Sequence, residues 1–333
     1  MFELLGICLA LVALLALNAL AATLTSALWR ALRGRLEDWP AAARARLLFA
    51  LRVFPPFIAA VCVGALLAPA YVLHEPRRAV EPISLKLGAL AVISAAGLML
   101  ALWRGVAAWI ATRRLIKDWL RVAEPVRFDQ IRVPAYRLRH PFPVIAIVGA
   151  IRPKLFVADH LFRSLTREEM TAAIAHESGH LAARDNLKRA ALRVCRDALA
   201  IFPSGARLDR GWAEASEAAA DEHAAGGGRA VALDLASALV KIARLVPEGV
   251  KPAMPASALL IGDGADGISR RVRQLALLAT LDKVSSGRRV FDSKAWPWAC
   301  FAAILISAIL SMTKPSTLLA IHDVIELAVS KLQ

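Results

Sequence analysis

The sequence is poor in cysteine and in aromatic residues. Its 333 residues include four Cys, and only 6% of the residues are Phe, Trp or Tyr. Cys8, Cys62 and Cys300 lie in long apolar runs, and Cys195 lies in a polar segment. This distribution does not form the disulfide framework of a small secreted protein. Since a free buried cysteine behaves as a small apolar residue, we expect packing rather than chemistry from all four.

The sequence is also short of acidic residues, which leaves a strongly basic chain. Asp and Glu number 27 against 42 Lys and Arg, and the formal net charge is +15. A nucleic-acid-binding protein can carry such a charge, but it needs a basic face interleaved with aromatic residues on a recognisable module. The sequence has no such module, so we expect no nucleic-acid partner.

Apolar residues are in excess. They make up 58% of the chain and charged residues only 21%, whereas about 45 to 50% apolar is usual for a soluble protein. Four runs, at about 4–28, 53–73, 87–111 and 296–313, are candidates for transmembrane helices. Glu3 stands where a signal peptide needs a basic residue, so we interpret the first run as a membrane span. The second run has Pro55 and Pro56 at its start, where proline costs little.

Charge predicts how these spans are oriented. The segment 29–52 has six Arg against two acidic residues, and the block 112–295 has 30 Lys and Arg against 20 Asp and Glu. The segments 73–86 and 314–333 are nearly neutral. The positive-inside rule therefore predicts an integral protein of the cytoplasmic membrane, with an outer N-terminus and with 112–295 as a single cytoplasmic domain.

One motif in this domain carries chemistry. Residues 176–180 read His-Glu-Ser-Gly-His, and a capping box of Thr166 and Glu169 predicts a helix over 167–183. His176 and His180 then share one helical face and can bind one Zn²⁺, with Glu177 as the general base. A helix with this many charged residues is not a membrane span, which disfavours an intramembrane site-two type of protease. Gly179 is expected to allow a neighbouring element to pack closely.

A catalytic zinc needs a third protein ligand and an open position. Glu217 and Asp221 lie four residues apart on a helix predicted over 212–225, which the glycines 226–228 end. Such a pair is often only a solvated helix face, but Glu217 can bind zinc while Asp221 orients a ligand imidazole. The other candidates for the ligand are Glu214, Glu222 and His223. Asp185 is a further candidate for orienting a ligand, and His223 and Arg271 are candidates for stabilising an oxyanion.

Two short apolar strands are predicted before the motif, over 144–150 and 154–157. An edge strand there can bind a substrate peptide by β-augmentation. On this view Val157→Pro should damage cleavage without removing zinc.

These residues resemble gluzincin membrane peptidases. The resemblance rests on 141–185, with Pro153 to Val157, Leu165 to Glu169 and the HExxH motif, on Glu217 with Asp221, and on 268–275. Most of the support for Glu217 as a ligand comes from it. Two families share this core, namely the prenyl-protease and heat-shock membrane proteases and the antirepressor peptidases of the beta-lactam sensor-transducer type. Three spans before the zinc domain and one after it resemble the sensor-transducers, without their C-terminal penicillin-binding sensor domain.

The resemblance implies a mainly α membrane protein with four transmembrane helices and an α+β zinc-metallopeptidase domain inserted between the third and fourth. Its implied function is a zinc metalloendopeptidase in signal transduction that cleaves a repressor or itself. Two alternatives stay open: a broad-substrate quality-control protease, and a non-proteolytic receptor with structural zinc, which would have no use for Glu177. The tail 314–333 is predicted as an amphipathic helix that lies on the outer membrane surface or binds a partner, and the input is expected from a homo-oligomer or a sensor in trans.

Overall fold

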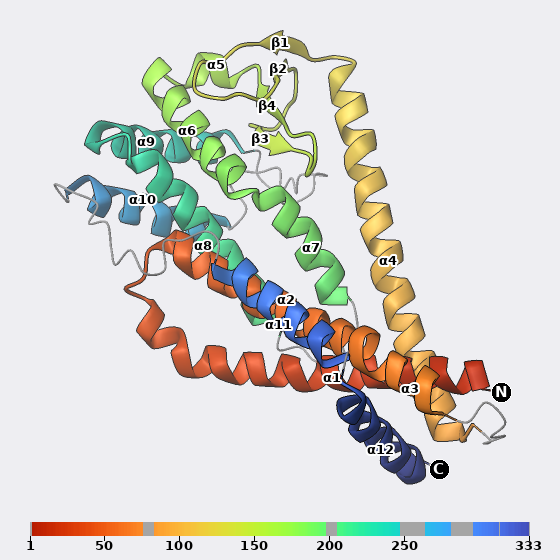
Figure 1. The fold of residues 1–333 in the computed structure, drawn as a ribbon. Coiled ribbons are helices and arrows are strands. Elements are labelled where there is room, and N and C mark those ends of the chain that lie inside the picture. The colour runs from red at the N-terminus through yellow and green to blue at the C-terminus, as the bar shows by residue number, and fades with distance from the viewer. Residues whose placement is uncertain are drawn as a thin grey trace.

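In a computed structural model, the structure describes residues 2–75, 83–197, 205–246, 264–280, 296–312 and 314–332. Long helices form one end of the molecule, and a small sheet covered by shorter helices forms the other (Figure 1). The parts are joined by α4, which runs from the first end to the sheet. The predicted class, mainly helical with a small sheet, is confirmed.

In the described part of the chain, three helices are long and apolar enough to cross a membrane. The first is α1 (Phe2–Leu32), which ends in a 3₁₀ turn at Arg33–Leu36. The second is one continuous helix made of α2 (Ala41–Cys62), a π-helical turn (Val63–Leu67) and α3 (Ala68–His74), and the third is α4 (Leu85–Leu120). The fourth predicted span corresponds to α11 (Trp296–Met312), which is followed by α12 (Pro315–Leu332). A fourth span results only if Ala299–Ser311 and Pro315–Val324, bent by 95°, count as one broken span.

Two predicted boundaries differ from the structure. The second helix begins at Ala41, so Pro55 and Pro56 lie in its interior and most of 29–52 is helical rather than a loop. The third helix continues past residue 111 to Leu120. In both cases the helix continues past the apolar run because its polar end packs on the domain; Arg52 on α2, for example, pairs with Asp209.

The sheet has four strands in the order β1-β2-β4-β3. Their bounds are β1 Glu124–Val126, β2 Ala135–Leu138, β3 Ile145–Val148 and β4 Lys154–Ala158. β2 and β4 are parallel, and the other two pairs are antiparallel. The two predicted strands are β3 and β4, whereas β1 and β2 were not predicted. Since β4 is paired on both sides, β3 is the edge strand nearest the HExxH motif.

Six helices complete the domain. They are α5 (Leu161–Ser164), α6 (Arg167–Ala183), α7 (Asp185–Asp197), α8 (Gly205–Ala225), α9 (Arg229–Leu245) and α10 (Gly264–Thr280). The predicted bounds of α6 are confirmed; α8 ends as predicted but begins at residue 205 rather than 212. One apolar core joins the sheet to α6, α9 and α10, with Phe156, Ile174, Leu239 and Leu275 fully buried in it.

Candidate metal centre

The helix α6 fixes the two histidines of the motif. Thr166 caps it by accepting from the backbone N–H of Glu169 at 3.2 Å, and the Glu169 carboxylate accepts from the N–H of Thr166 at 2.8 Å. One turn apart on this helix, the rings of His176 and His180 have centroids 4.8 Å apart. His176 is fully buried, which gives it a fixed position in the core.

The helix α8 brings Glu217 to the two rings. Its Oε2 lies 3.6 Å from Nε2 of His176, and its Oε1 lies 3.5 Å from Nε2 of His180. The close approach of α8 depends on Gly179, as predicted: a Cβ there would lie 3.1 Å from both Cα of Ala220 and Cβ of His223. A side chain at residue 179 would therefore push α8 away from α6.

The donor set fits a zinc ion. All three ligand atoms lie within 4.8 Å of one another. Ligands held about 2.0 to 2.2 Å from a tetrahedral zinc are about 3.3 to 3.6 Å apart, which agrees with the two separations above. The buried Oε2 of Glu217 makes no hydrogen bond within the described residues, and Nη1 of Arg271 lies 3.2 Å from it. A buried carboxylate oxygen needs positive charge beside it, and a bound cation would add to that of Arg271.

The other candidates for the third ligand lie elsewhere. Glu214 is largely exposed and pairs with Arg270 at 3.5 Å. Glu222 accepts from the backbone N–H of Ala41, at the start of α2. His223 is exposed, with its Nε2 3.3 Å from Oγ of Ser178. The structure therefore brings only Glu217, among these four residues, into the cluster with His176 and His180.

Each imidazole is held from behind by a carboxylate. Oδ2 of Asp185 lies 2.8 Å from Nδ1 of His180, and Oδ1 of Asp221 lies 2.9 Å from Nδ1 of His176. The Asp185 carboxylate also accepts from Oγ of Ser216 at 2.7 Å. The left-handed conformation of Arg184, with φ of 55°, separates α6 from α7 and places Asp185 behind His180. Such carboxylates fix the ring orientation and leave Nε2 for the metal.

Two arginines contact Glu217. Arg271, on α10, pairs with Asp221 at 2.7 Å and lies 3.2 Å from Oε2 of Glu217. The structure places its guanidinium against these two carboxylates, and its predicted role in stabilising an oxyanion stays a prediction. Arg189, on α7, lies 3.1 Å from Oε1 of Glu217 and was not predicted. The one signal in the sequence that could have placed Arg189 near this cluster was its spacing of four residues from Asp185, because residues so spaced share a face of a helix.

The electrostatics of the cluster favour a cation. Burial lowers the pKa of His180, but the charge of Glu217 and the hydrogen bonds that the imidazole donates to Asp185 and Glu217 outweigh it and raise that pKa to about 10. Burial raises the pKa of Glu217, yet His180, His176 and Arg271 hold it well below its usual range. The carboxylates thus hold positive charge at the imidazoles, which is the condition in which a metal cation replaces a proton.

Glu177 faces the edge of the sheet. Its Oε2 accepts from the backbone N–H of Ile147 on β3 at 3.0 Å. Burial raises the pKa of Glu177, against the charges of His180 and His176, which makes the carboxylate a better proton acceptor. The side chain of Asn186 donates to the carbonyl of Ile147 at 2.7 Å.

Val157, in contrast, is buried in β4, which is paired with a strand on both sides. Val157→Pro would therefore break the sheet rather than probe its edge.

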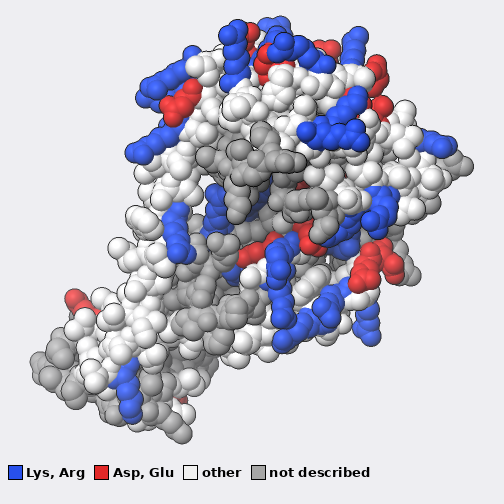
Figure 2. All heavy atoms as spheres, turned by 180° about the vertical axis from the view of Figure 1, so that it is seen from behind, with Lys and Arg blue, Asp and Glu red and all other residues white. Residues whose placement is uncertain are grey.

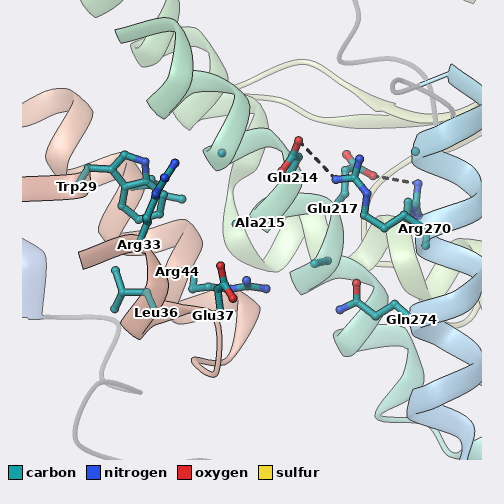
Figure 3. A pocket seen from close by; sticks show the side chains of 15 residues that line it. Trp29, Arg33, Leu36, Glu37, Arg44, Glu214, Ala215, Glu217, Arg270 and Gln274 are labelled. Carbon is teal, nitrogen blue, oxygen red and sulfur yellow. Dashed lines mark ion pairs between the residues drawn. The ribbon is translucent and has the colours of Figure 1, made fainter. Parts of the chain in front are cut away.

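A cavity of about 350 Å³ adjoins the cluster on the side of the membrane helices. Figure 3 shows Trp29 and Arg33 at the end of α1 facing Glu214 and Glu217 of α8, with Arg270 of α10 on the far side. The cavity therefore connects the candidate ligand Glu217 with the polar ends of two apolar helices.

Residues 146–208 match the model of Peptidase family M48. The match includes β4, α6 and the HExxH motif, and it ends before Glu217. No curated protein and no solved structure matched the chain. The matched segment is similar to a family of metallopeptidases, and together with the three apolar helices it indicates a metallopeptidase associated with a membrane.

Proposed function

We propose that this protein is a membrane-integrated zinc metalloendopeptidase of the gluzincin type, which cleaves cytoplasmic protein substrates. The observation that carries the proposal is the convergence of His176, His180 and Glu217 on one point, with Glu177 beside them on the same helix. A structural zinc site needs no general base, so the buried Glu177 favours an enzyme over a non-proteolytic receptor.

Zinc at this site would supply Lewis-acid chemistry, polarising a peptide carbonyl and making water nucleophilic at neutral pH. His176, His180 and Glu217 would hold the ion. Glu177 takes a proton from water and passes it to the departing amine. Asp185 and Asp221 keep the rings in place during this transfer, and Arg189 and Arg271 keep Glu217 oriented.

The edge of β3 is the proposed binding site for the substrate backbone. Ile147 directs its N–H and C=O away from β4, toward Glu177 and Asn186. Ile145 lies two residues earlier and points the same way, since alternate residues of a strand face the same edge. A peptide strand pairing there would replace the bonds of Ile147 to Glu177 and Asn186, and it would lie next to Glu177, where its scissile bond must be.

The proposed orientation has the domain in the cytoplasm and the N-terminus outside. Lys and Arg gather over the domain and the adjoining helix ends, and few lie on the opposite end of the molecule near α3 and the N-terminus (Figure 2). This distribution supports the positive-inside interpretation. Zinc at the cytoplasmic site would then meet cytoplasmic substrates or cytoplasmic segments of the chain itself.

A role in signal transduction completes the proposal. Three apolar helices precede the domain and α11 follows it, which is the arrangement of the sensor-transducer peptidases that the sequence resembles. The substrate is then a regulator such as a repressor, or the chain itself, and the input comes from a homo-oligomer or a sensor in trans.

The test compares wild type with Glu177→Ala in membranes. We expect an unchanged zinc content and a loss of self-cleavage, or of cleavage of a co-expressed repressor, by about 10² to 10⁴. Glu168→Ala, an exposed change on the same helix, should cleave like wild type. Equal cleavage by wild type and Glu177→Ala would end the peptidase proposal.

A further inference from the structure

A second group of metal-ligating residues lies far from the first, where α12 packs beside the end of α3 (Figure 1). Glu75 follows α3 directly, and His322 and Glu326 lie one turn apart on α12. One ligand atom from each of the three residues lies within 4.8 Å of the other two. Nothing in the proposed peptidase mechanism uses them.

The separations resemble those of the first cluster. Nδ1 of His322 lies 3.8 Å from Oε2 of Glu75, and its Nε2 lies 3.5 Å from Oε1 of Glu326. These distances are longer than hydrogen bonds. The two ring nitrogens point to opposite sides of the imidazole, so one ion can bind only one of them. The approach of one donor atom from each residue within 4.8 Å of the other two is what makes the three residues a possible ligand set.

Burial gives a second reason to expect a ligand. The side chains of His322 and Glu75 are only 12% and 10% exposed. In the described part of the chain, Nδ1 of His322 is buried without a hydrogen-bond partner, which is unfavourable unless something binds it. Glu326 is 66% exposed and leaves the cluster open to solvent. His74 adds another imidazole, with its ring centre 6.0 Å from that of His322.

We propose that Glu75, His322 and Glu326 bind a divalent transition-metal ion such as Zn²⁺, which clamps α12 to the end of α3. The imidazole favours a transition metal, because Mg²⁺ and Ca²⁺ prefer oxygen ligands throughout. Leu318 and Ile321 of α12 already pack in an apolar cluster with Leu5 and Tyr71. The ion adds a polar clamp to this apolar contact.

The clamp lies at one end of a helix whose other end meets the metal centre. Ala41, at the start of the continuous helix Ala41–His74, donates its backbone N–H to Glu222 of α8. Leu48, on the continuous helix, packs with Trp212 of α8 in one apolar cluster. The second cluster therefore lies at the far end of a helix whose near end contacts α8, the helix that carries Glu217.

The experiment counts bound metal on the full chain in detergent. Wild type is stripped with a chelator, dialysed against Zn²⁺, and analysed for metal by mass spectrometry. We expect two zinc ions per chain in wild type, and one in His322→Ala and in Glu75→Gln. The double variant His176→Ala/His180→Ala should also keep one, and it reports on the second cluster alone. Dialysis against Mg²⁺ should load neither site.

The ion at the first site serves as the check on folding, because a misfolded variant would lose both. Asp323→Asn is the matched control on α12, since Asp323 is exposed and outside the cluster; it should keep both ions. The proposal is overturned if His322→Ala and Glu75→Gln keep as much zinc as wild type, if wild type binds a single ion that His176→Ala/His180→Ala loses, or if Mg²⁺ fills the second site. These results do not depend on cleavage, so they stand apart from the test of the peptidase.

Discussion

The two histidine and carboxylate clusters of this protein differ in how they are supported. In the metal centre, both ligand imidazoles have a carboxylate behind Nδ1, and two arginines hold the ligand Glu217. In the cluster at α12, Nδ1 of His322 itself points into the group of ligands, and Glu326 is largely exposed. A metal site with oriented ligands binds more tightly, because little order is lost on binding. If both clusters bind zinc as proposed, the first should therefore hold its ion more tightly than the second.

The largest effect should come from Glu217→Gln. The amide keeps the shape of the side chain but removes the charge that holds a cation, so we expect loss of the ion at the first site and of all cleavage. Metal analysis after dialysis should show one ion fewer than wild type, with the ion at His322 retained. Glu214→Gln, an exposed change one turn earlier on α8, is the control and should keep wild-type metal content and activity. Retention of zinc and cleavage by Glu217→Gln would show that the third ligand is another residue.

Asp185→Asn should have an intermediate effect. The amide still accepts a hydrogen bond from Nδ1 of His180, but it lacks the charge that orients the ring and raises its basicity. Loss of such a partner lowers metal affinity by about 10- to 100-fold. Competition with a chelator of known affinity measures the change, and Asp118→Asn, at the exposed end of α4, is the control. If Asp185→Asn binds zinc as tightly as wild type, the carboxylates behind the imidazoles do not explain the difference between the clusters.

The sequence predicted the parts of this site that depend on local spacing. The capping box and the interval of four residues place Thr166, His176 and His180 on α6 without knowledge of the rest of the fold. The positions of Arg189 and Arg271 could not be predicted in this way, because they depend on how α7 and α10 pack against α8. Their ion pairs with Glu217 join residues 28 and 54 positions apart in the sequence.

The fold shows the same division. The apolar runs predicted where helices can cross a membrane, but a hydropathy pattern does not show where a helix ends once it leaves the lipid. α4 therefore continues to Leu120, and α2 begins at Ala41. In both helices, contacts with the domain stabilise the polar end. β1 (Glu-Pro-Val) and β2 (Ala-Tyr-Arg-Leu) were not predicted because neither forms an apolar run, whereas the equally short β3 (Ile-Ala-Ile-Val) does.

The smallest effect should come from Glu169→Gln, which tests whether α6 holds its position without metal. Burial raises the pKa of Glu169, but hydrogen bonds from Lys241, Ser237 and the N–H of Thr166 outweigh it and leave the pKa lowered. A carboxyl with a lowered pKa in the folded state stabilises the fold above its unfolded pKa of about 4.3, and this stabilisation is lost as the pH falls through the lowered value. Loss of this capping carboxylate should cost about 1 kcal/mol at pH 7.

Thermal unfolding of the metal-free protein between pH 7 and pH 3 measures this difference. At pH 7 the unfolding temperature of wild type should exceed that of Glu169→Gln, and this gap should close as the pH approaches 3. Glu124→Gln is the control, because Glu124 is exposed on β1 and takes no part in capping α6. A gap that is the same at pH 7 and pH 3 would mean that packing, rather than the charge of Glu169, fixes the start of α6. A gap that closes would show that α6 is held by its own capping network, so that His176 and His180 are in position before the ion binds.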